Sequence, residues 1–147
     1  MMQADCIVVE ARSWIGTPYV HQASVKGAGT DCLGLLRGVW RAVLGREPML
    51  VPAYTPDWDE AAASEVLMSA AEQCLRRKPL SAAALGDVLL FRMRDEFVAK
   101  HLGIQSGVGA EAAFIHAYSR HAVVESPLSV PWARRVVARF AFPEGAG

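Results

Sequence analysis

Hydrophobic and polar positions follow a helical period in the first half of the chain. Apolar side chains within residues 7–14 fall at positions i, i+4 and i+7, and the Gly-Thr-Pro triplet at 16–18 would end this helix. A second apolar stripe at helical spacing runs between Asp31 and Gly45. A third helix is predicted over about residues 56–77, because acidic residues occupy its first turn and basic residues suit the negative charge at its C-terminal end.

The pattern changes in the second half of the chain. Short segments rich in β-branched and aromatic residues, separated by turn residues, predict strands. These segments cover residues 88–91, 101–105, 113–118, 122–125 and 135–142. Helices followed by strands favour an α+β fold with an antiparallel sheet over an alternating α/β fold. We expect a single domain over residues 1–147, since this length is typical of one domain.

The balance of charges and the placing of the cysteines argue against several classes of protein. The 15 Lys and Arg residues balance 15 Asp and Glu residues, which argues against binding nucleic acid or a membrane surface through a basic excess. Cys6, Cys32 and Cys74 lie too far apart for a disulfide framework or a zinc knuckle, so we expect no metal and no cofactor. The chain shows neither a signal peptide nor an apolar run of the ~18 residues that a membrane helix needs. We expect a soluble protein made in the cytoplasm.

The tetrapeptide Asp31-Cys32-Leu33-Gly34 is the strongest candidate for chemistry. It follows a glycine-containing loop and opens the second predicted helix, so Cys32 would lie in the first helical turn. The positive end of a helix dipole favours a thiolate, and the free backbone N–H groups there can hold an oxyanion. The alternative is a core position, because free cysteine is one of the residue types most often buried.

A thiolate nucleophile needs a base, and the chain offers four histidines. His101 opens a predicted strand whose alternate residues point into the core, which leaves the imidazole on the other face. His116 lies inside an otherwise apolar strand, where a buried core histidine is the alternative. His121 is expected in a surface turn, and His21 in a loop at the rim of the site.

Five short motifs occur in order along the chain. They are Gly16-Thr17-Pro18-Tyr19, Asp31-Cys32-x-Gly34, Gly86-Asp87-Val88-Leu89-Leu90-Phe91, His101-Leu102-Gly103-Ile104 and Phe114-Ile115-His116-Ala117. This series resembles the NlpC family of papain-like cell-wall cysteine peptidases, over about residues 11–140. The resemblance implies N-terminal helices packed on a C-terminal antiparallel sheet. The context from Tyr19 to Arg41 resembles the subset carried by tailed phages and gene transfer agents.

The resemblance also implies roles for individual residues. Cys32 would be the nucleophile, His101 the general base and acid, and His116 the polar residue that orients His101. The Tyr19 hydroxyl would help the Cys32 backbone N–H to hold the oxyanion. Asp31 would either recognise the free amine of the substrate or cap the helix. The substrates of the family are peptidoglycan stem peptides, commonly cut between D-γ-glutamyl and diaminopimelic acid.

Three features depart from the pattern of the family. Leu33 follows the cysteine where most members carry Ser or Gly, and we expect it to narrow the cleft on one side. The pair His21-Gln22 stands where many members have an aromatic residue followed by glycines, so the substrate subsites are expected to differ. The segment 46–85 is longer than the usual connection and is a candidate docking surface.

Other functions remain open. A papain-like acyltransferase or thioesterase would use the same Cys–His pair on a lipid or another acyl donor, although the chain lacks an amphipathic basic helix. A CHAP-type amidase would differ only in the amide that it cuts. A structural tail-tip or baseplate module with a weak or unused active site would dock through the alanine-rich third helix or through the C-terminal strand with Arg134, Arg135 and Arg139. The alternatives for these two features are a solvated helix and an edge strand.

The motif context and the lack of a signal peptide together predict where the protein works. We expect a component of the tail tip or baseplate of a phage-like particle, which delivers it to the wall of the target cell. Its partners would be the peptidoglycan stem peptide and neighbouring tail proteins, with neither nucleic acid nor membrane among them.

Overall fold

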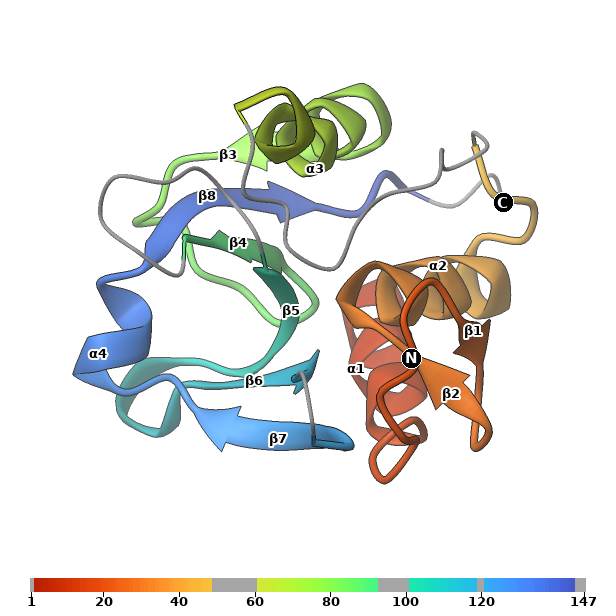
Figure 1. Cartoon of the computed structure of the whole chain (residues 1–147). Coiled ribbons are helices and arrows are strands. Elements are labelled where there is room, and N and C mark those ends of the chain that lie inside the picture. The colour runs from red at the N-terminus through yellow and green to blue at the C-terminus, as the bar shows by residue number, and fades with distance from the viewer. Residues whose placement is uncertain (1, 49–60, 93–100, 119–120, 145–147) are drawn as a thin grey trace.

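The computed structural model describes residues 2–48, 61–92, 101–118 and 121–144 as helices packed on an antiparallel sheet (Figure 1). The elements in chain order are α1 (Gln3–Arg12), β1 (Ser24–Val25), β2 (Gly29–Thr30), α2 (Cys32–Val43), α3 (Ala61–Cys74), β3 (Arg76–Lys78), β4 (Val88–Phe91), β5 (His101–Gly107), the 3-10 helix η1 (Gly109–Glu111), β6 (Ala113–Ala117), β7 (Val123–Pro127), α4 (Val130–Ala133) and β8 (Val136–Ala141). None of the helices in these ranges has the length and hydropathy to cross a membrane. The α+β fold predicted from the hydrophobic pattern is confirmed.

Six strands form one antiparallel sheet in the order β3-β8-β4-β5-β6-β7. The sheet is curved, with α1 and α2 on one side of it and α4 on the other (Figure 1). The hairpin β1–β2 lies beside the start of α2 and pairs Ser24 with Thr30. Strand β5 therefore lies in the middle of the sheet, flanked by β4 and β6.

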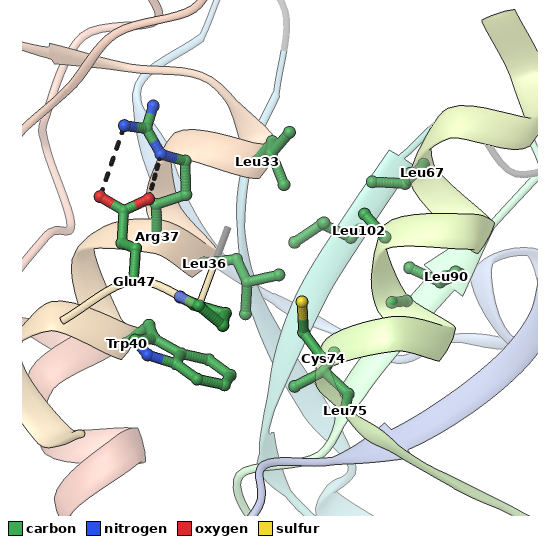
Figure 2. Close-up of a pocket in the computed structure, with 13 residues that line it drawn as sticks. Leu33, Leu36, Arg37, Trp40, Glu47, Leu67, Cys74, Leu75, Leu90 and Leu102 are labelled. Carbon is green, nitrogen blue, oxygen red and sulfur yellow. Dashed lines mark hydrogen bonds and ion pairs between the residues drawn. The ribbon is translucent and has the colours of Figure 1, made fainter. Parts of the chain in front are cut away.

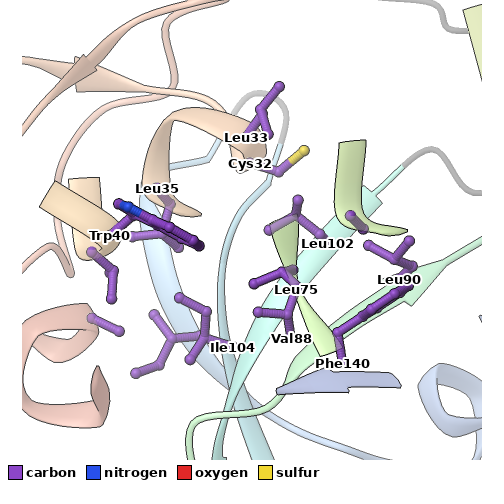
Figure 3. Close-up of a cluster of buried hydrophobic side chains, with 14 of the residues drawn as sticks. Cys32, Leu33, Leu35, Trp40, Leu75, Val88, Leu90, Leu102, Ile104 and Phe140 are labelled. Carbon is purple, nitrogen blue, oxygen red and sulfur yellow. The ribbon is translucent and has the colours of Figure 1, made fainter. Parts of the chain in front are cut away.

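One face of the sheet is buried against the apolar sides of α1 and α2 (Figure 3). This cluster includes, from the helices, Ile7, Ala11, Leu35 and Val39 and, from the sheet, Val88, Leu90, Leu102 and Ile104. Burial of a large aliphatic side chain contributes about 1.5–3 kcal/mol, so this contact holds the two halves of the fold together. At Gly38 on α2, any Cβ would collide with the indole ring of Trp14. The backbone of α2 can therefore lie this close to Trp14 only with glycine at this position.

The opposite face of the sheet carries a second, smaller cluster. Its buried members are Leu89, Phe91 and Phe114, and Trp132 from α4 is one of the side chains that pack against them. Because both faces of β4 are covered, all four of its residues are buried. This double burial explains the uninterrupted apolar run at 88–91.

Three local predictions are wrong or incomplete. The basic residues 76–78, predicted as the last turn of the third helix, form β3, because their backbone pairs with β8 after the helix ends at Cys74. Residues 56–60 of the same predicted helix lie outside the described residues, as does the end of the tail, 145–147. The sequence pattern also missed α4 and the hairpin at 24–30, which are too short to show a hydrophobic period.

The prediction that Arg139 belongs to a docking face is wrong, and so is the alternative that its strand lies at the edge of the sheet. Strand β8 lies between β3 and β4, and Arg139 is only 5% exposed. Its Nη1 donates hydrogen bonds to Asp87 Oδ2 at 2.7 Å and to Gln105 Oε1 at 2.5 Å. The buried carboxylate of Asp87 needs such partners, and this explains why the guanidinium of Arg139 is buried beside it. Arg134 is exposed and Arg135 is half-buried, so these two remain candidates for a docking face.

Asp87 is the centre of this buried network, and its loss should destabilise the fold. Lys78 Nζ donates to both carboxylate oxygens at 2.9 and 3.0 Å, and the backbone N–H of Ala84 donates at 2.9 Å. Asp87→Ala leaves the buried Arg139 without its counter-charge, so we expect the free energy of unfolding to fall by about 3–5 kcal/mol. Urea denaturation measures this change.

The matched control is Glu72→Ala, which breaks the exposed ion pair with Arg77 (3.2 Å, both side chains 52% exposed). Exposed pairs contribute about 0–1 kcal/mol, so this variant should unfold almost as the wild type does. Equal losses in the two variants would contradict a special role for the buried network.

Candidate active site

The start of α2 is tied down by Asp31, which caps the helix. Its Oδ1 accepts the backbone N–H of Gly34 at 2.8 Å, and its Oδ2 accepts the backbone N–H of Gln22 at 2.7 Å. Gln22 holds a left-handed backbone (φ 65°), which is uncommon for a residue other than glycine. The bond to Asp31 therefore holds the preceding loop against the helix start, and the Asp31 side chain is only 2% exposed.

Gly34 explains why the motif around Cys32 needs a glycine. A Cβ at this position would overlap the carbonyl oxygen of Ala23 and the hydroxyl of Thr30. The hairpin thus packs directly on the first turn of α2, and Ser24 Oγ donates to the carbonyl oxygen of Gly34 at 2.6 Å.

Cys32 is the first residue of α2, as predicted, and it is also part of the buried apolar cluster, with 6% of its surface exposed. Figure 3 shows it at the start of α2, on the side where Leu102 of β5 lies. The pKa of the thiol is raised to about 12, mainly by burial and to a smaller extent by the charge of Asp31. The backbone N–H groups of Leu102, Leu33 and Cys32 itself oppose this shift. The N–H groups at the helix start favour a thiolate, as expected, but burial outweighs them and the thiol is protonated at rest.

The structure brings His101 and His116 together. His101 opens β5 and His116 lies on the neighbouring β6, and Nε2 of His101 is 2.8 Å from Nδ1 of His116. Their residues are 7% and 1% exposed. Because this contact occupies Nε2 of His101, Nδ1 is the nitrogen left to exchange a proton with a nucleophile.

Both rings are neutral at neutral pH. Burial is the main cause that lowers the pKa of His101, and His116 lowers it further. Burial also lowers the pKa of His116, with a smaller effect from His121. A buried neutral imidazole is a proton acceptor at one nitrogen and a donor at the other, which suits a general base.

Cys32 lies beside the start of β5, next to the residue that follows His101. One of the backbone N–H groups that act on the Cys32 sulfur belongs to Leu102. Leu102 points to the helix side of the sheet, while the His101 ring lies on the opposite side with Phe91. The thiol thus approaches β5 at Leu102, one residue along the strand from His101.

Tyr19 is half-buried near the same helix start. Its backbone forms a bridge with Thr30, directly before Asp31. The pKa of the phenol is raised to about 12, mainly by burial and to a smaller extent by Cys32 and Asp31. The hydroxyl is therefore protonated at neutral pH and can donate a hydrogen bond.

The other two histidines are not part of the hydrogen-bonded pair. His121 is exposed and stacks on Tyr118, with ring centroids 5.1 Å apart. His21 Nδ1 lies 3.8 Å from Asp31 Oδ2, so its ring borders the capped helix start. Within the described residues, no group of three or more His, Cys, Asp or Glu side chains could hold a metal ion.

Sequence reasoning missed two residues beside the histidine pair. Ser126 on β7 has its Oγ 2.9 Å from Nε2 of His116. The Trp132 ring lies with its centroid 5.2 Å from that of His116 and 5.9 Å from that of His101. The only local signal for Trp132 is the Ser-Val-Pro triplet at 129–131, a helix-start pattern that places the indole on α4.

An apolar pocket lies between α2 and α3, next to the start of α2 (Figure 2). Leu33 and Leu102, the neighbours of Cys32 and His101, contribute to its wall. Glu47 accepts a hydrogen bond from Arg37 Nε at 2.7 Å beside the pocket. Leu33, predicted to narrow the cleft, thus points its apolar side chain into this pocket.

Comparison with known proteins identifies a family over the part of the chain that carries the five motifs. The model of the NlpC/P60 family matches residues 16–140. No curated protein matches the chain. The solved NlpC/p60 domain of the peptidoglycan hydrolase SagA is 24% identical, with a TM-score of 0.63, and the match covers 95% of this chain and 98% of that one.

Two longer structures contain a similar domain. One is a lipoprotein-like protein of the NLP/P60 family from Staphylococcus aureus subsp. aureus Mu50, with 18% identity, a TM-score of 0.62, and coverage of 97% of this chain and 42% of that one. The other is an NlpC/P60 family protein from Bacillus cereus ATCC 10987, with 16% identity, a TM-score of 0.66, and coverage of 95% and 40%. This chain spans about two fifths of the length of these two proteins.

At these identities the solved structures show the fold, which is the papain-like α+β fold of NlpC/P60 domains. The family match extends from the residue that opens the first motif to the last strand of the sheet. The chain belongs to the NlpC/P60 family.

Proposed function

We propose that this chain is a cysteine peptidase that hydrolyses an amide bond in the stem peptides of peptidoglycan. The observation that carries the proposal is the 2.8 Å contact between His101 and His116, next to a helix that begins with Cys32. Membership of the NlpC/P60 family supports a hydrolase, and cysteine peptidase is the general kind of enzyme in that family. The similar domain of SagA belongs to a protein named as a peptidoglycan hydrolase, which supports the choice of substrate.

The reaction would start from a neutral thiol and a neutral imidazole. As the Cys32 sulfur attacks the amide carbonyl carbon, its proton moves to Nδ1 of His101 and the carbonyl oxygen becomes an oxyanion. The backbone N–H of Cys32 and the Tyr19 hydroxyl are the proposed donors to that oxyanion. The imidazolium and the oxyanion form at the same time, so each charge stabilises the other in the buried site.

The second half of the reaction would regenerate the enzyme. The imidazolium of His101 gives its proton to the leaving amine as the C–N bond breaks, which leaves a thioester on Cys32. His101 then removes a proton from a water molecule that attacks the thioester, and the proton returns to the sulfur as the C–S bond breaks. His116 would hold the His101 ring in place throughout.

The bond proposed for cleavage is that between D-γ-glutamyl and diaminopimelic acid. Asp31 was expected either to recognise the substrate amine or to cap the helix, and its burial and its two backbone hydrogen bonds favour the cap. His21, a half-buried side chain that borders Asp31, would face the substrate.

Removal of the nucleophile or the base should abolish cleavage of purified peptidoglycan. We expect Cys32→Ala and His101→Ala to lower the rate by at least about 10³-fold, because neither step of the reaction has another group to perform it. His116→Ala should lower it less, because water partly replaces an orienting group. Mass spectrometry of the released ends identifies the bond, and cleavage should persist in the presence of a chelator.

The matched control is His121→Ala, which removes an exposed imidazole outside the pair. This variant should retain nearly the wild-type rate. Equal cleavage by wild type and Cys32→Ala would refute the proposal, and ends from a different amide would indicate a CHAP-type amidase.

The lowered pKa of His101 predicts an unusual pH profile. His101 acts as a base only while its ring is neutral. Since the folded protein protonates this ring only below the ordinary imidazole pKa of about 6.5, the acid limb of kcat/KM should lie below that value. The unfolded chain binds these protons and the folded chain does not, so the free energy of unfolding should decrease as the pH falls below about 6.5. Kinetics and circular dichroism over the same pH range separate the two effects. An acid limb at pH 6.5 or higher in folded protein would contradict the neutral pair.

We also propose that the protein works as a tail-tip or baseplate component of a phage-like particle. The motif context from Tyr19 to Arg41 supports this assignment, and the exposed Arg134 is a candidate contact for a neighbouring tail protein. We expect the protein to co-purify with such particles. The Cys32→Ala variant should be incorporated equally well, since docking does not use the thiol, but its particles should fail to open the target cell wall.

Two outcomes of this experiment would contradict parts of the proposal. Recovery of the protein only as a free monomer, absent from purified particles, would contradict the tail location. Particles that contain Cys32→Ala and open the wall at the wild-type rate would indicate a structural module.

A further inference from the structure

A chain of hydrogen bonds leads from His101 across three neighbouring strands. Nε2 of His101 on β5 contacts Nδ1 of His116 on β6 at 2.8 Å, and Nε2 of His116 contacts Oγ of Ser126 on β7 at 2.9 Å. In the register of the sheet, His116 pairs with Val124 and Phe114 pairs with Ser126. All four side chains share one face of the sheet, so Ser126 reaches His116 diagonally.

We propose that Ser126 is a positioning residue that selects the tautomer of the histidine pair and thereby keeps His101 able to act as a base. This inference rests on the hydrolase activity proposed above. Ser126 acts through His116 and has no role in binding the reacting atoms.

Two arrangements of protons satisfy this chain of hydrogen bonds. In the first, the N–H at Nε2 of His101 donates to Nδ1 of His116, and the N–H at Nε2 of His116 donates to the Ser126 oxygen. Nδ1 of His101 then carries a lone pair and can accept the proton of Cys32. In the second, the Ser126 hydroxyl donates to His116, His116 donates to His101, and Nδ1 of His101 already holds a proton. Only the first arrangement gives an active base.

In the surroundings of the pair, the hydrogen bond to Ser126 is what selects between the two arrangements of protons. Each ring is neutral and therefore carries one proton, so the state of one ring dictates that of the other. The ring of Phe114 lies 4.2 Å from that of His116, and Trp132 presents its edge at 5.2 Å, so apolar groups enclose His116. A hydrogen bond in such surroundings is stronger than one in water.

The position of Ser126 favours the first arrangement. Ser126 is half-buried and lines an open depression on the surface together with Glu111 and Glu125. Its hydroxyl proton can therefore point to solvent, which leaves the oxygen lone pair toward His116. A serine, whose hydroxyl rotates freely, can accept the His116 proton in this way, whereas alanine at the same position cannot.

Imidazole ¹⁵N spectra of the full-length protein at neutral pH test the inference directly, because the two tautomers differ in which nitrogen carries the proton. In the wild type we expect His101 and His116 to be protonated at Nε2. In Ser126→Ala, the tautomer protonated at Nδ1 should appear in both rings, kcat should fall about tenfold and KM should stay unchanged. Ser126→Thr retains the hydroxyl and should restore both the wild-type spectrum and kcat.

The matched control is Val124→Ala, which removes a half-buried side chain directly opposite His116 but no hydrogen bond. It should leave the tautomers and kcat unchanged. Wild-type tautomers in Ser126→Ala, or protonation at Nδ1 in the wild type, would overturn the inference. If the wild type cleaves no peptidoglycan while Ser126→Ala still shifts the tautomers, the effect of Ser126 on the pair stands and the hydrolase assignment fails.

Discussion

The contact between the capped start of α2 and the start of β5 is the interaction on which the site depends. Asp31 joins the first turn of α2 to the loop before it, and Gly34 lets the β1–β2 hairpin pack against that turn. The apolar cluster between α2 and the sheet, which includes Leu35 and Leu102, packs the helix against the sheet. The position of the thiol therefore depends on both a polar cap and hydrophobic burial.

The same burial determines the protonation of the reacting groups. Removal of water raises the pKa of Cys32 and lowers that of His101, so both groups are uncharged at rest. In the proposed reaction, the proton of Cys32 would therefore move to His101 during the attack, since the thiol is protonated at rest. The hydrogen bonds that extend from His101 through His116 to Ser126 then become important, because they decide which nitrogen of His101 is able to receive that proton.

Different parts of the same strand contribute to the proposed active site and to the buried network around Asp87. At one end of β5, His101 belongs to the proposed site, while nearer the other end Gln105 joins the buried network of Asp87 and Arg139. The Gly-Asp pair at 86–87 thus contributes stability, since Asp87 pairs with the half-buried Lys78 and with the buried Arg139. This motif of the family therefore serves the fold.

The sequence by itself determined that the main helices precede the strands of the sheet, that a helix begins with Cys32, and that two strands carry His101 and His116. These features follow from local spacing and from the residues that start and end each element, which the chain shows directly. Only the tertiary structure decided that the thiol is protonated, that Arg139 is buried, and that Ser126 and Trp132 lie beside His116. Each of these depends on burial and on contacts between distant segments, and no local pattern records which groups will meet.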